Sequence, residues 1–336
     1  MLQVDGMSQP ETQAARSRHE IVVSIINYRT GAMTIDAVRS VLADRSVDDV
    51  HVVVVDNRSD DGSAEMIAEW IAAQDPPPPV TLIRSETNSG FSSGHNQGMA
   101  ACSAEAYLVL NSDALLRPGA LGRMLATLRE SPQAGFIAPR LEHDDGEPQL
   151  SCFRFPNPIG EMLRMARLGP LTRLFRKHDQ SLGFSPDPEE IGWASFACIL
   201  VRGAMRDAIG PMDEGFFLYS EDTEYCWRAR RAGWRVVHEP RARAVHLRGA
   251  SGPAKSLRAA RKRLPRYIYA SRTRFFYLAY GRSGLLAANL LWYPGAAIGW
   301  TRRRLAGHEG RLVADEEFDI WTNFLDPLGD DGRKGS

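Results

Sequence analysis

Residues 50–63 read VHVVVVDNRSDDGS, an apolar, β-branched run that ends in a polar loop. The run predicts a strand that is apolar on both faces, and such strands belong in parallel sheets covered by helices on both sides. Asp56 lies directly at the carboxyl end of this strand, where α/β sheets bind their ligands, so we expect it to be functional. Asp60 and Asp61, farther along the loop, are equally suited to capping the next helix.

Three more short apolar runs resemble this one and alternate with segments of helical character. We predict strands at Ile21 to Ile26, Val50 to Val55, Val80 to Ile83 and Ala106 to Leu110, and helices at Thr34 to Ala43, Ala64 to Ala73 and Ser93 to Ala101. The order β-α-β-α-β-α-β indicates a parallel sheet with right-handed crossovers. Ligand-binding groups are therefore expected in the loops that follow the strands.

Composition limits the classes of function. The chain has 336 residues with 43% hydrophobic content, enough to bury a sizeable core. Lys plus Arg and Asp plus Glu both total 41, so no global field favours a nucleic-acid partner. The cysteines show neither close C-x-x-C spacing nor a secretory context, which predicts reduced thiols and a cytoplasmic location. Residues 1–20 lack the apolar core of a signal peptide and are predicted to be a loose arm.

The segment from Asn88 to Gly98 follows the third predicted strand and reads NSGFSSGHNQG. Its glycines recur every four residues, which places them on one face of a helix and lets a ligand or a neighbouring strand approach the backbone closely. The segment matches neither the G-x-G-x-x-G dinucleotide fingerprint nor the G-x-x-x-x-G-K-[ST] phosphate loop. Dehydrogenase and P-loop functions therefore lose their main support.

Two acidic motifs complete the candidate site. Asn111-Ser112-Asp113 follows the fourth strand, and residues 217–228, FLYSEDTEYCWR, set three carboxylates and an arginine among aromatic residues. Core packing alone would favour apolar residues there, so we interpret residues 217–228 as part of an active site. Glu224 and Arg228 have the i, i+4 spacing of an ordinary helix ion pair, and we assign Glu224 no catalytic role.

Five motifs, in this order, resemble the family 2 inverting glycosyltransferases of the GT-A fold. They are Asn27-Tyr28-Arg29, Val55-Asp56-Asn57-x-Ser59-x-Asp61-Gly62-Ser63, Asn88-x-Gly90-Phe91-x-x-Gly94-x-Asn96-x-Gly98, Leu110-Asn111-x-Asp113 and Glu221-Asp222-x-Glu224-x-x-x-Arg228-x-x-x-x-Gly233-Trp234. The resemblance covers about residues 20 to 250. It is specific to the bacterial branch that includes rhamnosyltransferases of cell-wall, O-antigen and exopolysaccharide assembly.

The resemblance implies a role for each motif. Asp222 would be the catalytic base, and Asp113, last in the D-x-D position, would bind a Mg²⁺ or Mn²⁺ ion that bridges the donor diphosphate. His246 lies where some relatives supply a further metal ligand, although a histidine there is also an ordinary hydrogen-bonded structural residue. The residues implied in binding the nucleotide and donor sugar are Asn27, Tyr28, Arg29, Asp56, Asn57, Asn88, Gly90, Phe91, Gly94, Asn96, Asn111 and Ser112.

The chemistry of these residue types agrees with transfer of a sugar. The departing nucleoside diphosphate gains negative charge that a hard divalent cation stabilises, and a carboxylate can take the proton of the attacking hydroxyl. Asn111 replaces the first acid of D-x-D and removes one anionic ligand. The Q-x-x-R-W signature of processive synthases is absent, so single-sugar addition is favoured over polymerisation.

The branch resemblance makes dTDP-L-rhamnose the leading donor and a glycan or polyprenyl-linked molecule the acceptor. Two alternatives stay open. A sugar-phosphate nucleotidyltransferase shares the sheet but usually has a Gly-rich, Arg- and Lys-bearing first loop, which residues 27–31 lack. A non-catalytic nucleotide-sugar-binding module would have no reason to keep Asp222 together with Asp113.

The region after residue 250 differs in composition. Residues 255–304 contain twelve Lys or Arg and no acid, and the apolar run Leu285 to Trp300 is shorter than the roughly 20 residues that a membrane span needs. We predict amphipathic helices on an anionic membrane, with Trp292, Tyr293 and Trp300 at the interface. The alternatives are a packed helical appendage with a solvated basic face or an oligomer contact, such as that of a dimer.

The predicted organisation has four parts. A flexible arm covers residues 1–20, a GT-A domain covers 21–250, a basic amphipathic helical extension covers 251–310 and an acidic tail covers 311–336. Together these parts predict a cytoplasmic enzyme bound peripherally to the inner face of the plasma membrane.

Overall fold

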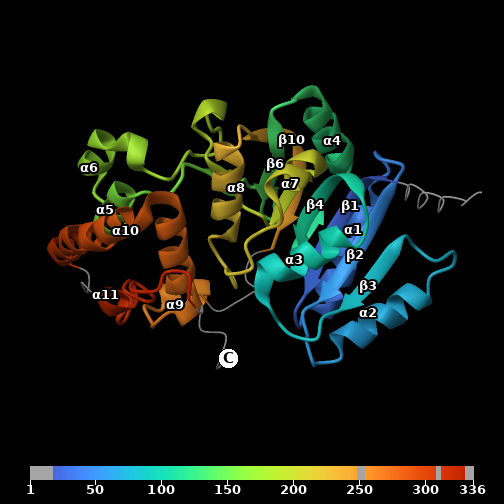
Figure 1. The fold of residues 1–336 in the computed structure, drawn as a ribbon, viewed down its shortest axis with the longest axis horizontal. Helices are drawn as coiled ribbons and strands as arrows, with labels where there is room; N and C mark the ends of the chain where they lie inside the picture. Colours follow the sequence, from blue (N-terminus) through green and yellow to red (C-terminus); the bar gives the residue numbers. More distant parts are fainter. Residues whose placement is uncertain (1–17, 248–253, 308–311, 330–336) are drawn as a thin grey trace, which may run out of the picture.

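The computed structural model describes residues 18–247, 254–307 and 312–329. Its central feature is an eight-stranded sheet in the order β3-β2-β1-β4-β9-β6-β10-β5. In Figure 1 this sheet and its covering helices lie on the right, and the helices of the C-terminal region lie on the left. Most of the predicted arm and the junction predicted at residue 250 lie outside the described residues, as does the end of the predicted tail.

All seven elements predicted for the first third of the chain are present. They are β1 (His19–Asn27), α1 (Gly31–Ala43), β2 (Val50–Asp56), α2 (Ser63–Ala72), β3 (Val80–Arg84), α3 (Gly90–Ala100) and β4 (Ala104–Asn111). The four strands pair in parallel, as predicted. Residues of β2 alternate between two cores, because Val52 and Val54 pack on one face of the sheet and Val53 and Val55 on the other. The continuous apolar run therefore reflects burial on both faces.

The rest of the chain adds strands of both directions. The elements that follow are β5 (Ala114–Leu116), α4 (Ala120–Glu130), β6 (Ala134–Glu142), β7 (Cys152–Phe153), α5 (Pro158–Ala166), α6 (Gly169–Leu174), β8 (Trp193–Ala194), β9 (Cys198–Arg202), α7 (Gly203–Ile209), α8 (Glu221–Arg231), β10 (Arg235–His246), α9 (Ala254–Ala259), α10 (Arg266–Leu305) and α11 (Glu316–Asp319). The 3₁₀ turns are Arg176–His178 and Pro188–Glu190, and β7 pairs with β8 in a separate small sheet.

Beyond the four predicted parallel strands the sheet is mixed, which the sequence did not predict. Strand β9 runs antiparallel to both β4 and β6, because it enters the sheet beside the carboxyl end of β4, where Cys198 pairs with Leu110. Strand β5 is also antiparallel to its neighbour β10. A strand that enters at the ligand-binding edge can only run back through the sheet.

The register brings the polar ends of three strands to one edge. Asn27 of β1 lies opposite Asp56 of β2, and Ile26 lies opposite Asn111 of β4. The loops that follow β1, β2 and β4 therefore leave the sheet side by side, as expected for ligand-binding loops of an α/β sheet.

The glycine face of α3 is pressed against protein. A methyl group on Gly98 would lie 2.2 Å from Ser24 Oγ in β1, and one on Gly94 would lie 2.7 Å from Ile26 Cδ1. Gly90 has φ +87° and would place a methyl group 2.2 Å from the carbonyl oxygen of Phe217. The glycine spacing allows close approach of either a ligand or a neighbouring part of the protein. At all three positions the structure shows a neighbouring part of the protein.

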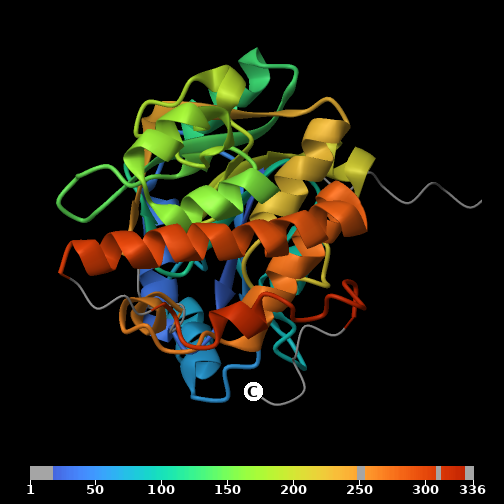
Figure 2. The ribbon, with the colours of Figure 1, turned by 90° about the vertical axis from the view of Figure 1, so that its left-hand side faces the viewer.

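The C-terminal region wraps one end of the molecule. Helix α10 changes direction at Gly281, where φ is 70°, and thus has a first arm of residues 266–280 and a second arm of residues 282–305. The second arm crosses α5 so closely that methyl groups on Gly295 and Gly299 would lie 2.4 and 2.3 Å from the carbonyl oxygens of Met162 and Met165. Figure 2 shows the long helix lying across this side of the protein.

The prediction that Trp292 lies at a membrane interface is wrong. Its side chain is 1% exposed and packs in a small core with Met165 of α5 and Ile320 of the tail. The described part of the acidic tail also joins this region, because Asp319 pairs with Arg263 at 2.7 Å. None of the helices in the described ranges combines the length and apolar character that crossing a bilayer requires.

We predict that Gly98→Ala destabilises the protein by about 1 to 3 kcal/mol, because the added methyl group must displace Ser24 or move α3 away from β1. Denaturant unfolding followed by circular dichroism measures this change. Gly169→Ala is the matched control, since a methyl group there meets nothing within 4 Å, and it should alter the free energy of unfolding by less than about 0.5 kcal/mol. Equal stability of the two variants would contradict the tight contact.

Candidate active site

The side chain of Asn27 connects the loops after β1 and β2. Its Nδ2 donates to Asp56 Oδ1 at 2.6 Å and to the hydroxyl oxygens of Ser59 and Ser63 at 3.0 and 2.8 Å. Its Oδ1 accepts from the backbone N–H of Thr30 at 3.2 Å. Asn27 is fully buried. Within the predicted donor site it therefore holds the surrounding loops in position.

The other predicted donor-site residues of these loops differ in exposure. Asp56 is buried and also accepts a hydrogen bond from Ser59 N, while Asn57 Nδ2 donates to the carbonyl oxygen of Gly90 at 3.0 Å. Tyr28 and Arg29 are exposed, and the Arg29 guanidinium lies 5.1 Å from the centre of the Tyr28 ring. Among the predicted donor-site residues of these two loops, Tyr28 and Arg29 therefore have the side chains that a ligand can reach.

The start of α3 lies beside the loop that leads into α8. Phe91 N donates to the carbonyl oxygen of Phe217 at 2.7 Å, and Asn88 Oδ1 accepts from Gly90 N. Asn96 lies one to two turns farther along α3, and its amide binds the backbone of Met212 through both its oxygen and its nitrogen. This predicted donor-site segment thus also fixes residues 212–217 in place.

Asp113 is the most unusual carboxylate of this edge. It is 1% exposed, and neither oxygen has a hydrogen-bond partner among the residues that the structure describes. His246 Nε2 lies 3.5 Å from its Oδ1, and the Nδ1 atom of His246 is also buried without a partner. A buried carboxylate without hydrogen bonds is costly, and a bound cation would remove that cost.

The neighbours of Asp113 complete the end of β4. Ser112 Oγ accepts a hydrogen bond from Thr30 Oγ1 at 3.0 Å, which joins this loop to the one after β1. Asn111 is partly exposed, and its backbone N–H donates to the carbonyl oxygen of Ala197 at 2.9 Å. Within the described part of the chain no group of three or more His, Cys, Asp or Glu side chains could hold a metal. Asp113 and His246 form a two-residue donor set, which fits an ion that also binds a diphosphate.

Asp222 lies in the first turn of α8. Its Oδ1 accepts hydrogen bonds from Thr223 N at 2.7 Å and Thr223 Oγ1 at 3.1 Å. Burial raises the pKa of Asp222 to about 6, although these hydrogen bonds oppose the change. Burial, followed by the charge of Asp222, raises the pKa of Glu221 well above its ordinary value. Asp222 therefore ionises first, which suits it to accept a proton near neutral pH.

A short backbone bridge links α8 to the end of β4. The backbone N–H of Phe196 stabilises the charged form of Asp222, and the next residue, Ala197, accepts the hydrogen bond from Asn111. The bridge connects the candidate base with the strand end that carries Asp113. By contrast, Glu224 forms the predicted ion pair with Arg228, at 3.0 Å.

Several residues of this site were given no role from the sequence. Thr30 lies outside the five motifs, and Ser59 and Ser63 belong to the second motif without being assigned to binding. Tyr219 and Ser220 adopt φ values of 70° and 67°, an unusual conformation for residues that are neither Gly nor Asn. Such positions are found only from the backbone geometry.

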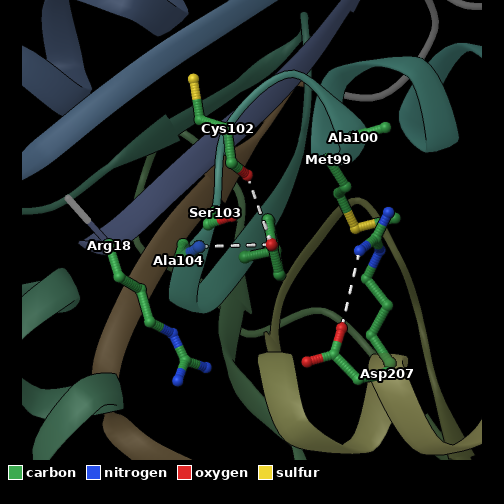
Figure 3. A pocket seen from close by; sticks show the side chains of 9 residues that line it. Arg18, Met99, Ala100, Cys102, Ser103, Ala104 and Asp207 are labelled. Carbon is green, nitrogen blue, oxygen red and sulfur yellow. Dashed lines mark hydrogen bonds and ion pairs between the residues drawn. The ribbon is translucent and has the colours of Figure 1, made fainter. Parts of the chain in front are cut away.

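A separate hollow of about 420 Å³ lies away from this site. Figure 3 shows Arg18, Cys102, Ser103 and Asp207 among the residues that line it. Ala104, at the start of β4, lines this hollow, whereas the candidate site lies at Asn111, at the end of β4. We assign the hollow no part in the chemistry described above.

Comparisons with known proteins identify relatives of this chain. The family described as Glycosyl transferase family 2 matches residues 21–183. The chain is 28% identical over 263 residues to the N-acetylglucosaminyl-diphospho-decaprenol L-rhamnosyltransferase of Mycobacterium tuberculosis, an overlap of 72% of this chain and 79% of that protein. It is also 28% identical over 198 residues to the low-salt glycan biosynthesis hexosyltransferase Agl10 of Haloferax volcanii, 58% of each protein.

A solved structure shows the same fold. The mannosyltransferase PcManGT from Pyrobaculum calidifontis, in complex with GDP-Man and Mn²⁺, superposes with a TM-score of 0.54 at 15% sequence identity, covering 93% of this chain and 85% of that one. The alternatives of a nucleotidyltransferase and of a non-catalytic binding module are therefore not retained. Residues 21–183 match glycosyl transferase family 2, and the chain is a glycosyltransferase of the GT-A fold, similar to the rhamnosyltransferases.

Proposed function

We propose that this enzyme transfers a single L-rhamnose from dTDP-L-rhamnose to a polyprenyl-diphosphate-linked sugar, with inversion at the anomeric carbon. The observation that carries the proposal is that the backbone of Phe196 and Ala197 links Asp222 to the strand end that precedes Asp113. Asp222 has the raised pKa of a proton acceptor, and Asp113 is a buried carboxylate without a hydrogen bond. The mycobacterial relative supports the choice of sugar and acceptor, since its name specifies both.

The proposed reaction is a single displacement. The acceptor oxygen forms a bond to the anomeric carbon as the bond from that carbon to the diphosphate oxygen breaks, and the electron pair leaves with the nucleoside diphosphate. Asp222 takes the proton of the acceptor hydroxyl, a contribution on the order of 10² to 10⁴ in rate. Attack from the face opposite the leaving group inverts the anomeric centre.

Asp113 and His246 are the residues that would hold a divalent cation. When bound, Mg²⁺ or Mn²⁺ neutralises the charge that develops on the leaving diphosphate. The carboxylate of Asp113 suits either ion, and the imidazole of His246 adds a nitrogen ligand, which favours Mn²⁺ over Mg²⁺. The structural neighbour PcManGT, which was solved with Mn²⁺, supports this assignment.

We predict that Asp222→Asn lowers kcat by about 10² to 10⁴ and leaves the Kd for dTDP within about twofold, because the amide keeps the shape but cannot accept a proton. Steady-state kinetics and calorimetry measure the two quantities. In the parent enzyme kcat/KM should fall about tenfold per pH unit below pH 6, since protonated Asp222 is inactive.

Glu221→Gln is the matched comparison, because Glu221 is the adjacent carboxyl of the same helical turn. If that variant loses activity while Asp222→Asn retains most of its kcat, the base is Glu221. Asp36 is exposed and forms a surface ion pair with Arg39. Asp36→Asn therefore controls for a general loss of charge and should keep full activity.

A second prediction concerns Asp113. Asp113→Ala should weaken Mn²⁺ binding in the presence of dTDP by about tenfold or more, as followed by electron paramagnetic resonance of the free ion. His246→Ala should have a smaller effect, because a single neutral ligand is lost. Activity of the parent enzyme should disappear in EDTA and return with Mn²⁺ or Mg²⁺. Full activity in the chelator would mean that cationic side chains stabilise the leaving group instead.

We also propose that the second arm of α10 lies on an anionic membrane surface, where a polyprenyl-linked acceptor is found. Its exposed apolar face is defined by Leu286, Leu290, Tyr293 and Trp300, which recur at helical spacing. Leu290 is 53% and Trp300 47% exposed, and Phe318 of the tail, next to the Tyr293 contact at Glu317, is 70% exposed. Large exposed apolar side chains beside basic ones are typical of surface-bound helices.

Arginines at the end of this arm supply the complementary charge. Arg302 and Arg304 are exposed, and the Arg304 guanidinium lies 5.4 Å from the ring centre of Trp300. The wrong prediction for Trp292 is thus replaced by a different, exposed face of the same helix. Attraction to anionic lipid is worth about 1 kcal/mol per basic residue near the surface.

We expect the double variant Arg302→Glu and Arg304→Glu to bind vesicles of mixed phosphatidylcholine and phosphatidylglycerol at least about tenfold more weakly than the parent. Sedimentation measures binding, which should also weaken with added salt. The control is Arg39→Glu with Arg45→Glu, which changes net charge equally at exposed positions of α1 and the following loop. Equal binding by both double variants, or no binding by the parent, would overturn the proposal.

A further inference from the structure

Three aromatic side chains from distant parts of the chain meet just before Asp222. Tyr219 stacks on Tyr267 of the first arm of α10, with ring centroids 6.4 Å apart and an interplanar angle of 18°. Phe217 contacts the same ring at 5.4 Å and 58°. We call these three residues the aromatic shelf. None of them belongs to the residues assigned above to the donor or the metal.

The shelf is held in place from both sides. Phe217 accepts the hydrogen bond from Phe91 at the start of α3, and Ser271 Oγ of α10 donates to the carbonyl oxygen of Leu218 at 3.1 Å. Between these anchors, Tyr219 and Ser220 keep positive φ values of 70° and 67°. Such strained conformations cluster at ligand-binding sites.

The aromatic shelf is partly exposed to solvent and lies near charged side chains. Tyr219 is 41% exposed although it lies between two anchored segments. Burial and then the charge of Glu221 raise the pKa of Tyr219, while Arg258 of α9 acts in the opposite direction. The phenol of Tyr219 therefore lies within electrostatic reach of both the acidic start of α8 and a cation of α9.

The position of the shelf identifies its ligand. A general base must lie within hydrogen-bond distance of the acceptor hydroxyl, so the side chains beside Asp222 line the acceptor and not the nucleotide. Aromatic faces offer rigid apolar surface to the C–H face of a pyranose ring, and nearby polar groups orient it. The positive charge of Arg258, which acts on Tyr219, would attract the negative diphosphate of a diphosphate-linked sugar.

We propose that the aromatic shelf is the acceptor-sugar subsite, in which a pyranose packs on Tyr219 and Tyr267 and presents its hydroxyl to Asp222. This inference rests on the proposed glycosyl transfer to a diphosphate-linked acceptor. It assigns a specificity role to α10, a helix outside the residues matched by the family domain. The first arm of α10 is then part of the active site and not only a support for the membrane-facing arm.

The test uses direct binding, which needs no turnover. The probe is N-acetylglucosaminyl diphosphate carrying a short alkyl chain, and its contacts with the full-length protein are followed by saturation-transfer NMR and calorimetry. Tyr267→Ala should raise the Kd for this probe about tenfold, while Tyr267→Phe should change it less than twofold. Tyr267→Leu keeps apolar volume without a ring and should also weaken binding, which covers the case in which the alanine variant fails to fold.

Two controls separate the possible outcomes. Leu278→Ala, at an exposed position of the same helical arm, should bind the probe as the parent does. The alkyl diphosphate without a sugar should bind the parent and all Tyr267 variants equally. An equal loss of both probes would mean that the shelf holds the lipid chain, and unchanged binding by Tyr267→Ala and Tyr267→Leu would make it a packing cluster. Either result overturns the proposal.

The donor assignment is tested separately. If these binding results hold but dTDP-L-rhamnose supports no transfer, the donor proposed above is wrong and the acceptor subsite stands. If transfer occurs with unchanged acceptor KM in Tyr267→Ala, the glycosyltransferase function stands and the shelf assignment fails. dTDP affinity should be the same in every Tyr267 variant.

Discussion

The hydrogen bonds of Asn27 are the constraint on which the catalytic edge depends. One buried amide satisfies the carboxylate of Asp56, two serine hydroxyls of the next loop and the backbone where α1 begins. Thr30 extends the same network to Ser112 at the end of β4. Three loops that leave the sheet side by side are thereby fixed relative to one another before any ligand binds.

The second constraint comes from the C-terminal region. Ser271 and Tyr267 of α10 hold the segment that precedes Asp222, and Gly90 and Phe91 at the start of α3 hold it from the other side. A loop with two consecutive positive φ values would otherwise relax. The helical extension is therefore connected mechanically to Asp222, the proposed base, which provides a physical route by which the proposed membrane contact or acceptor would act on the proposed chemistry.

Charge is distributed according to burial. The acids at the active edge are buried, so desolvation raises the pKa values of Asp222 and Glu221 and separates their roles. Two described acids of the tail, Glu316 and Asp319, are also buried, but each faces an arginine: Glu316 faces Arg164 of α5, and Asp319 faces Arg263. Asp319 thus pairs with one cation of the basic run before α10 begins, whereas Arg302 and Arg304 are exposed at the end of that helix.

The sequence by itself determined the first half of the sheet, the helices between its strands and the polar residues at the strand ends. It did so because burial on both faces of a strand leaves a continuous apolar run, which is a local signal. The direction of β9, the burial of Trp292 and the aromatic shelf were decided only by tertiary structure. Each depends on contacts between residues far apart in the chain, as between Tyr219 and Tyr267, and no local pattern of residue types records which distant surface a side chain will meet.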